Sequence, residues 1–365
     1  MNRRRFIQSI LTGGVSISAT GCLEDNPRDT EENTRVNSGT ETFSTPDNPL
    51  SGNTAPNPEI DGVYERRYTQ TVDGHRTDLK MTLSKSLYEY YDARYRLDNE
   101  NIYQGNANPY GQYVADRYQS KVVRGVAEYF TSYGQENNLS RREIIDQVIG
   151  FVQQLEYTED QVNNGFNNYP QYPFETLVLQ EGDCEDTSIL TAALLKELGY
   201  DAILLLMPND AHMAVGVKGD NLPGTYYEYR GSRFYYLEAT APRRVGEVPS
   251  IVEDGRAQFL EIRSVPVLVF RWQGITQGDT ITINVDTRNV GNGSTRSAQI
   301  QTELFSRSSG RINSATSRRQ NLRPNQTKSM ELQMNLSNAQ QVSMRVSILI
   351  DGNIHDIDET GWNRI

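Results

Sequence analysis

The stretch Glu181-Gly182-Asp183-Cys184-Glu185-Asp186-Thr187-Ser188-Ile189-Leu190, which continues to Leu198-Gly199, predicts a tight turn followed by a buried helix. Asp183 is a favourable N-cap, and Asp186 three residues later completes a pair typical of a capping box. Leucines recur at helical spacing up to residue 198, and Gly199 suits the position just after a helix end. The helix therefore begins at Cys184, where the positive end of the helix dipole favours a thiolate.

Few side chains are available as partners for this thiol, because the chain holds two cysteines and three histidines. Residues 200–207 form an apolar run typical of a buried strand, and residues 211–217 predict a second strand with His212 near its start. Residues 234–240 predict a third strand, which carries Glu238. If these strands pair antiparallel, His212 and Glu238 lie on one face. A helix packed over that face brings Cys184 to the imidazole, which gives the nucleophile, base and orienting carboxylate of thiol acyl transfer.

The segments GDCED, LGYDA, HMAVGV and YYLEAT together resemble the transglutaminase-like superfamily, whose core is a papain-like cysteine-peptidase fold. The upstream segments FVQQLEY and YPQYPFETL belong to the same resemblance, which spans about residues 88–249. It implies an α+β fold in which a catalytic helix packs on an antiparallel sheet. It also implies that Cys184 is the nucleophile, His212 the general base and Glu238 the group that orients the imidazole. The superfamily more often has Asp at the third position.

Several interpretations of the function remain open. Resolution of a thioacyl intermediate by water gives a peptidase or amidase, which leads because microbial relatives of this type look more like hydrolases. Attack by a lysine amine gives a cross-linking transglutaminase, and an inactive triad gives a binding or scaffolding protein. We predict no cofactor and no dedicated metal site, with His75 and His355 at the surface. The expected partner is a protein or peptide substrate at the cell surface rather than nucleic acid, since the net charge is −11.

The N-terminus has the features of an export signal. Residues 1–22 run from an Arg-Arg-Arg-Phe segment through an apolar stretch to Cys22, which suggests the Tat route, and residues 19–22 resemble a lipobox. We therefore expect lipidation of Cys22 and anchoring at the extracellular face of the cell membrane. A plain signal peptide with an incidental cysteine is the alternative. The signal resembles that of lipoproteins from salt-adapted archaea, and the acidic composition suits a high-salt exterior.

The rest of the chain divides into a tether and two domains. Residues 23–60 are polar, lack apolar periodicity and predict a disordered tether. Residues 61–255 are assigned to the transglutaminase-like domain, with a hairpin about Asp73-Gly74 and helices at 84–96, 111–133 and 140–155 before the catalytic helix. Residues 265–365 show short alternating runs separated by turns, which predicts a small β-sandwich resembling immunoglobulin-like modules.

Opposing influences act on the pKa of Cys184. The carboxylates of Asp183, Glu185 and Asp186 raise it, whereas the helix dipole and a protonated His212 lower it. The sequence predicts a thiolate–imidazolium pair whose stability depends on Glu238. The backbone N–H of Cys184 is the first expected donor to an oxyanion, and Gln180 in the preceding turn is a candidate for the second.

Overall fold

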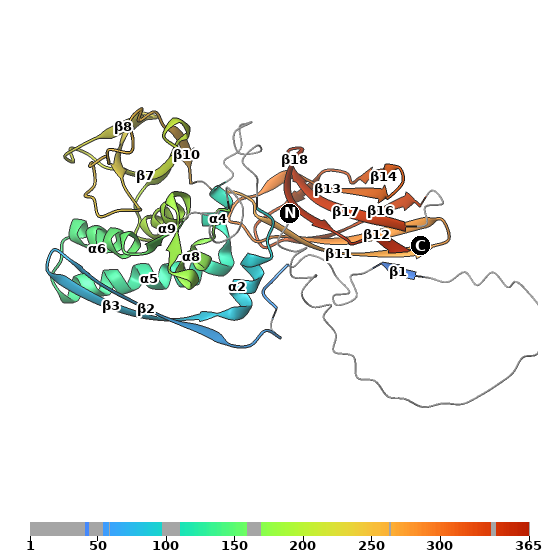
Figure 1. Ribbon diagram of the computed structural model, residues 1–365, viewed down its shortest axis with the longest axis horizontal. Coiled ribbons are helices and arrows are strands. Elements are labelled where there is room, and N and C mark those ends of the chain that lie inside the picture. The colour runs from blue at the N-terminus through green and yellow to red at the C-terminus, as the bar shows by residue number, and fades with distance from the viewer. Residues whose placement is uncertain are drawn as a thin grey trace, which may run out of the picture.

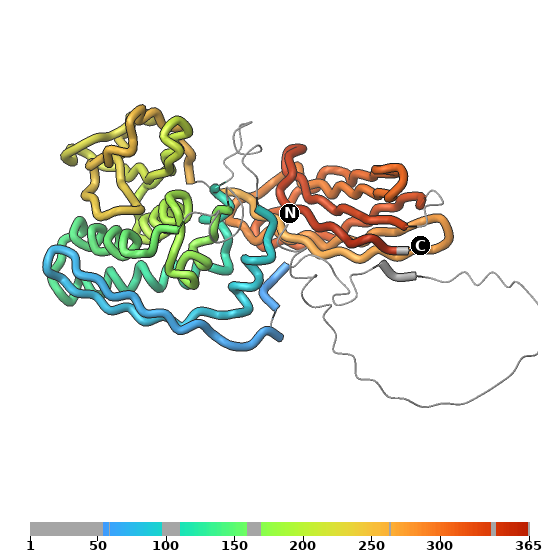
Figure 2. The backbone as a smooth tube through the Cα atoms, in the orientation of Figure 1, coloured from blue at the N-terminus to red at the C-terminus, as the bar shows by residue number. Residues whose placement is uncertain are grey.

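The computed structural model describes residues 41–43, 54–57, 59–96, 110–158, 169–262, 264–336 and 341–364. Figure 1 shows a part built of helices and strands beside a part built of strands, and the tube in Figure 2 follows the chain from one to the other. The predicted combination of helices and antiparallel strands is confirmed. The predicted signal segment, including Cys22, lies outside the described residues. Within the described part, no helix is both long enough and apolar enough to cross a membrane.

The first part opens with a hairpin of β2 (Val63–Val72) and β3 (His75–Ser84). Its two-residue turn is Asp73-Gly74, and both turn residues have positive φ, as a type I′ turn requires. Ser84 then caps α2 (Lys85–Asp92), which is shorter than the predicted helix.

The predicted helix at 111–133 is interrupted by Asp116. It divides into α4 (Gly111–Ala115) and α5 (Arg117–Glu136), because Asp116 is extended and its side chain accepts the N–H of Tyr118 as an N-cap. The next helix, α6 (Arg141–Gln153), begins with the capping box predicted from Ser140 and Glu143.

The helix that begins at Cys184 has the predicted limits and caps. It follows α8 (Pro173–Leu179) and β5 (Glu181–Gly182), which pairs in parallel with β4 (Glu156–Tyr157). α9 (Cys184–Glu197) carries the Asp183–Asp186 capping box, and its central residues are fully buried. Gly182 is required before it, because a Cβ there lies 2.7 Å from the Cβ of Asp186.

A five-stranded antiparallel sheet follows α9 in the order β10-β6-β7-β9-β8. Its strands are β6 (Ala202–Met207), β7 (His212–Lys218), β8 (Tyr226–Tyr229), β9 (Ser232–Leu237) and β10 (Gln258–Glu261). The ring of Tyr229 on one edge strand lies 4.9 Å from that of Phe259 on the other, so the sheet curls strongly. β10 lies beyond the boundary predicted at residue 255.

The second part is a pair of antiparallel sheets that share one hydrophobic cluster. One sheet has the order β1-β11-β12-β16, and the other has the order β14-β13-β17-β18, with β15 against β13 and β19 against β17. The strands are β1 (Glu41–Phe43), β11 (Leu268–Gln277), β12 (Thr280–Asn289), β13 (Thr295–Ser306), β14 (Gly310–Thr316), β15 (Gln320–Leu322), β16 (Thr327–Asn335), β17 (Gln341–Ile350), β18 (Asn353–Glu359) and β19 (Asn363–Arg364).

His355 joins the two sheets, which corrects its predicted surface position. Its Nε2 accepts the N–H of Leu268 at 3.0 Å, and burial together with the charge of Arg94 lowers its pKa to about 3. Trp272 makes a second link, because its indole N–H donates to Asp358 at 2.9 Å. Asp358 is therefore a buried hydrogen-bond acceptor.

The two parts contact each other. Val267, Val269 and Val290 belong to the hydrophobic cluster of the first part, and the N–H of Arg117 donates to the carbonyl of Val290 at 3.2 Å. Some residues of the predicted tether also make contacts: β1 pairs with β11, and the carbonyl of Asn57 accepts the hydroxyl of Ser86 at 2.7 Å. These residues depart from the expectation of a free tether.

Candidate active site

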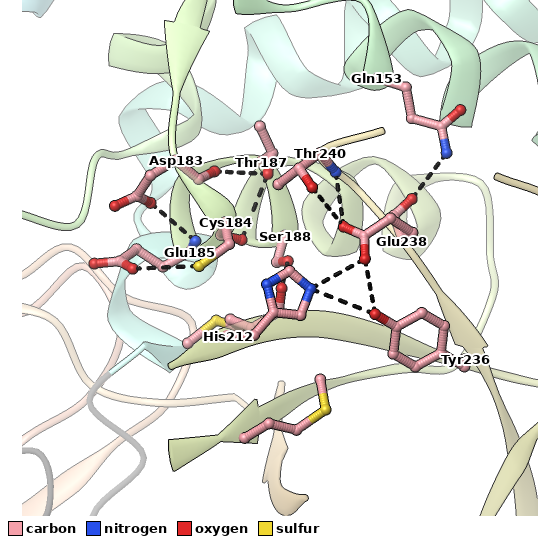
Figure 3. Close-up of polar contacts among 12 residues, drawn as sticks. Gln153, Asp183, Cys184, Glu185, Thr187, Ser188, His212, Tyr236, Glu238 and Thr240 are labelled. Atoms are coloured by element: carbon pink, nitrogen blue, oxygen red, sulfur yellow. Dashed lines mark hydrogen bonds and ion pairs between the residues drawn. The ribbon is translucent and has the colours of Figure 1, made fainter. Parts of the chain in front are cut away.

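His212 and Glu238 form a buried hydrogen-bonded pair. His212 is the first residue of β7, and Glu238 follows directly after the last residue of β9. Because β7 and β9 are antiparallel, with Val215 opposite Leu237, the side chains of His212 and Glu238 lie on the same face of the sheet. The distance from His212 Nε2 to Glu238 Oε2 is 3.0 Å, and the side chains are 7% and 1% exposed (Figure 3).

The carboxylate of Glu238 accepts four hydrogen bonds. Oε1 accepts the N–H of Thr240 at 3.0 Å and its hydroxyl at 2.7 Å, and Oε2 accepts the hydroxyl of Tyr236 at 2.7 Å as well as the imidazole of His212. Burial raises the pKa of Glu238, but the hydrogen bond and charge of His212 and the two bonds from Thr240 outweigh it and hold this pKa at about 2. The carboxylate is therefore ionised at neutral pH.

Tyr236 and Thr240 were not identified from the sequence. They lie two residues before and two residues after Glu238, so the alternation of side chains along a strand places all three on the same face. That spacing is the signal that points to them. The Tyr236 hydroxyl also lies 3.4 Å from His212 Nε2, so it contacts both members of the pair.

Cys184 lies at the start of α9, against the end of β7 that carries His212. Its thiol donates to Glu185 Oε2 at 3.9 Å, and a hydrogen bond from the backbone of Met213, the residue after His212, acts to lower the pKa of the thiol. The hydroxyl of Ser188 donates to the carbonyl of Met213 at 3.1 Å. In Figure 3 the imidazole lies between Cys184 and Glu238, with Nε2 toward the carboxylate and the other ring nitrogen on the cysteine side. The structure thus gathers the three predicted residues in one region.

The way α9 meets the sheet differs from the prediction. Met213, Val215 and Leu237 pack in one hydrophobic cluster with the apolar residues of α9, whereas Ala214 and Tyr236 pack on the other side of the sheet. The helix α9 therefore covers the face of the sheet opposite to the one that carries His212 and Glu238. Cys184 instead reaches the strand end, where the β7–β9 ladder has stopped at Val215 and the polar groups of Met213 are free to bond α9.

The environment of Cys184 favours the thiol. Burial raises the pKa of Cys184 well above its ordinary value, and the negative charges of Glu185 and Asp183 raise it further, against the opposing hydrogen bond from Met213. Asp183 does cap the helix, since its Oδ1 accepts the N–H of Glu185 at 2.9 Å and of Asp186 at 3.3 Å. This capping role does not remove the effect of the Asp183 charge on the pKa of the Cys184 thiol. The predicted thiolate–imidazolium pair is therefore not favoured in this conformation.

The first amides of α9 include one free donor. The N–H groups of Glu185, Asp186 and Thr187 bond to Asp183, whereas that of Cys184 has no hydrogen-bond partner in the described part of the chain. Gln180 does not point to this region: its side-chain amide donates to the carbonyl of Arg67 at 3.1 Å. The prediction of Gln180 as a second oxyanion donor is therefore wrong for this conformation.

One group of possible metal ligands surrounds the thiol. Ligand atoms of Asp183, Cys184 and Glu185 lie within 4.8 Å of one another. One oxygen of Asp183 is already bonded to two helix amides, so its carboxylate serves the helix start. This group is accounted for by the capping role of Asp183 and by the position of the candidate nucleophile Cys184.

Comparisons with known proteins give one informative match, to a family model, and several weak structural likenesses. A comparison with functionally characterised proteins gave no significant match. Solved structures that align include a β-glucosidase 3B from Thermotoga neapolitana, at 11% identity over 27% of this chain and 17% of that one, with a TM-score of 0.19. A β-glucosidase from Kluyveromyces marxianus aligns at 15% identity over 32% and 19%, with a TM-score of 0.19. A DUF3823 family protein from Bacteroides ovatus aligns at 11% identity over 45% and 88%, with a TM-score of 0.22.

These structural likenesses are too weak to carry an argument, and the chain spans less than a fifth of either β-glucosidase. A family model is more informative. It covers the segment with Cys184 and His212 and ends before Glu238. Residues 125–227 match a transglutaminase-like domain, and this supports the superfamily.

Proposed function

We propose that this protein is a cysteine-dependent hydrolase, a peptidase or amidase that acts through Cys184, His212 and Glu238. The observation that carries the proposal is the buried pair of His212 and an ionised Glu238 at 3.0 Å, set beside a cysteine at the start of a helix. A carboxylate in this position fixes the tautomer and orientation of the imidazole and stabilises its charged form.

The first step is attack of the Cys184 sulfur on a substrate carbonyl carbon. His212 removes the thiol proton as the C–S bond forms, and this order suits a thiol whose pKa is raised by burial and by acidic neighbours. The proton is then given to the leaving amine as the C–N bond breaks, which leaves a thioester on Cys184. Water, activated by the same imidazole, hydrolyses the thioester and restores the thiol.

The negative oxygen that forms during this reaction needs hydrogen-bond donors. The N–H of Cys184 suits this role, because it is the helix amide that Asp183 does not bond, and the helix dipole adds positive potential there. Glu238 remains ionised throughout, since its four donors stay in place when His212 gains or loses a proton.

The proposal includes a location. We place the protein on the extracellular face of the cell membrane, exported through the Tat route and anchored by lipid at Cys22. The expected substrate is a protein or peptide at the cell surface. These parts rest on the sequence pattern of residues 1–22. The halophilic archaeal origin that the signal and acidic composition suggest belongs to the same proposal.

The experiment incubates the purified full chain with a mixture of denatured proteins and follows three products in parallel. New peptide N-termini report a peptidase, free ammonia reports an amidase, and incorporation of a fluorescent primary amine reports transglutaminase chemistry. Cys184→Ala is the control, and mass spectrometry of the wild-type protein detects a thioester at Cys184. We expect one of the two hydrolytic products from the wild type and none from the variant.

Other outcomes decide between the alternatives. Amine incorporation that depends on Cys184 and exceeds hydrolysis overturns the hydrolase in favour of a cross-linking enzyme. Absence of all three products and of a thioester favours a non-catalytic binding or scaffolding protein on the same fold. A product that persists in Cys184→Ala removes this cysteine from the reaction.

A further inference from the structure

The outer edge of β2 presents unpaired backbone groups. β2 and β3 form a two-stranded sheet, so no further described strand covers either outer edge (Figure 1). The two-residue turn makes Val72 and His75 a hydrogen-bonded pair, and alternation along the strand then directs the N–H and C=O groups of Thr69 and Thr71 outward. Both threonines are exposed, and none of these four groups has a partner in the described part of the chain.

The edge of β3 is covered in a different way. Its outward groups are bonded by tyrosines of α5: the hydroxyl of Tyr129 accepts the N–H of Asp78 at 3.1 Å, and that of Tyr133 donates to the carbonyl of Arg76 at 3.0 Å. The contrast leaves the edge of β2 as the open side of this hairpin. An open edge of this kind accepts an extended chain as an added strand.

This edge lies in a groove. Two hollows of about 460 and 700 Å³ share Thr69 and Gln154 in their linings, and between them they are lined by β2 residues 67–72 and the turn residue Asp73. The end of α6 and the loop at 242–247 form the other walls. α6 approaches β2 closely because residue 150 is glycine, where a Cβ lies 2.4 Å from the side chain of Val72. The outward carbonyl of Arg67 is already bonded by the side-chain amide of Gln180 at 3.1 Å, so the open part of the edge runs from Thr69 to the end of β2 at Val72. These four residues extend about 13 Å, enough to pair with about four residues of an extended peptide.

The groove is more basic than the protein as a whole. Its lining carries five arginines and three carboxylates, whereas the chain has a net charge of −11. The guanidinium groups of Arg76, Arg142 and Arg243 make no direct ion pair within the described residues, while Arg67 is paired with Asp78 at 2.6 Å. The unpaired cations complement a negatively charged occupant.

We propose that this groove, made by β2 residues 67–72, the turn residue Asp73, the end of α6 and the 242–247 loop, binds an extended acidic peptide segment of a protein partner as a strand added to β2. The groove is separate from Cys184, but Gln153 in its wall connects it to the candidate active site. The amide of Gln153 donates to the carbonyl of Glu238 at 2.9 Å and to that of Arg243 at 3.1 Å. A bound peptide that contacts the loop carrying Arg243 is therefore connected, through the side chain of Gln153, to the backbone of Glu238.

The test measures binding of a fluorescein-labelled hexapeptide of alternating Glu and Val to the full chain carrying Cys184→Ala, so that turnover does not interfere. Thr71→Pro removes one outward N–H from an edge position where proline is tolerated, and Thr71→Val is the matched control that keeps it. We expect Thr71→Pro to weaken binding at least tenfold and Thr71→Val to change it less than twofold. Arg142→Ala and Arg243→Ala should each weaken binding severalfold and reduce its dependence on salt.

Two peptide controls keep the result independent of variant folding. The same peptide with N-methyl groups on alternate amides loses the strand hydrogen bonds, and a peptide with Lys in place of Glu reverses the charge. Equal binding of the N-methylated and parent peptides to the unsubstituted edge overturns the added strand. Equal or tighter binding of the Lys peptide overturns the acidic occupant. Because binding is measured without the nucleophile, absence of hydrolytic activity in the wild type does not affect this outcome.

Discussion

Replacement of Glu238 by Gln tests the arrangement of four hydrogen-bond donors around this carboxylate at the candidate active site. Every group around this carboxylate is a donor: the N–H and hydroxyl of Thr240 on Oε1, and Tyr236 and His212 on Oε2. A glutamine keeps one oxygen and replaces the other by an NH₂ group, which cannot accept. Whichever way the amide turns, two buried donors lose their acceptor, at about 1–3 kcal/mol each.

The pKa of Glu238 gives an independent magnitude. A pKa lowered from 4.5 to about 2 corresponds to about 3 kcal/mol of stabilisation by the ionised form. Since the folded-state pKa is the lower one, this contribution is complete above about pH 5 and is lost as the pH falls toward 2. The Glu238→Gln variant should therefore be about 3 kcal/mol less stable than wild type at pH 7, and this difference should shrink toward zero near pH 2.

The assay is urea unfolding followed by far-ultraviolet circular dichroism, which reports the helices, at pH values from 7 to 3. Glu136→Gln, at an exposed position on α5, is the control for loss of a carboxylate and should be nearly neutral throughout. A difference below about 0.5 kcal/mol at pH 7, or one that does not change with pH, refutes the reasoning. If the protein hydrolyses a substrate, kcat should fall on the order of 10²–10⁴-fold with little change in KM, since the imidazole loses its orienting anion.

Three further predictions concern neighbouring groups. Gly182→Ala places a Cβ 2.7 Å from that of Asp186 and should lower stability by about 1–3 kcal/mol in thermal unfolding; an unchanged Tm would show that β5 shifts freely. Tyr236→Phe removes one donor to the carboxylate of Glu238 and should cost about 1 kcal/mol in urea unfolding, and an effect as large as that of the glutamine variant would contradict this. In a Cys22→Ser background, Cys184 should react with iodoacetamide more slowly than free cysteine at pH 7 and accelerate only above about pH 9, whereas faster labelling at pH 7 would indicate a resting thiolate.

Much of the local structure was accessible from the sequence because short-range physics decides it. The capping box of Asp183 and Asp186 and the glycine after the helix define α9 within a residue, and the Asp73-Gly74 pair defines the hairpin turn. The order of cysteine, histidine and carboxylate along a helix and two strands also predicted which side chains to look for. Short strands of the second part, such as β15 and β19, are harder to predict, since they are formed by pairing with longer neighbours and not by their own pattern.

Only the tertiary structure decided the electrostatics and the contacts of the site. The pKa of Cys184 depends on how deeply α9 is buried, which no local pattern measures, and burial acts there together with Glu185 against the helix dipole. Gln180 bonds the carbonyl of Arg67, more than a hundred residues away in sequence, because the hairpin packs beside α8. The sequence by itself determined which chemical groups are present and where helices and strands begin. Long-range packing determined which of these groups meet, since burial and hydrogen-bond partners depend on segments that are distant along the chain.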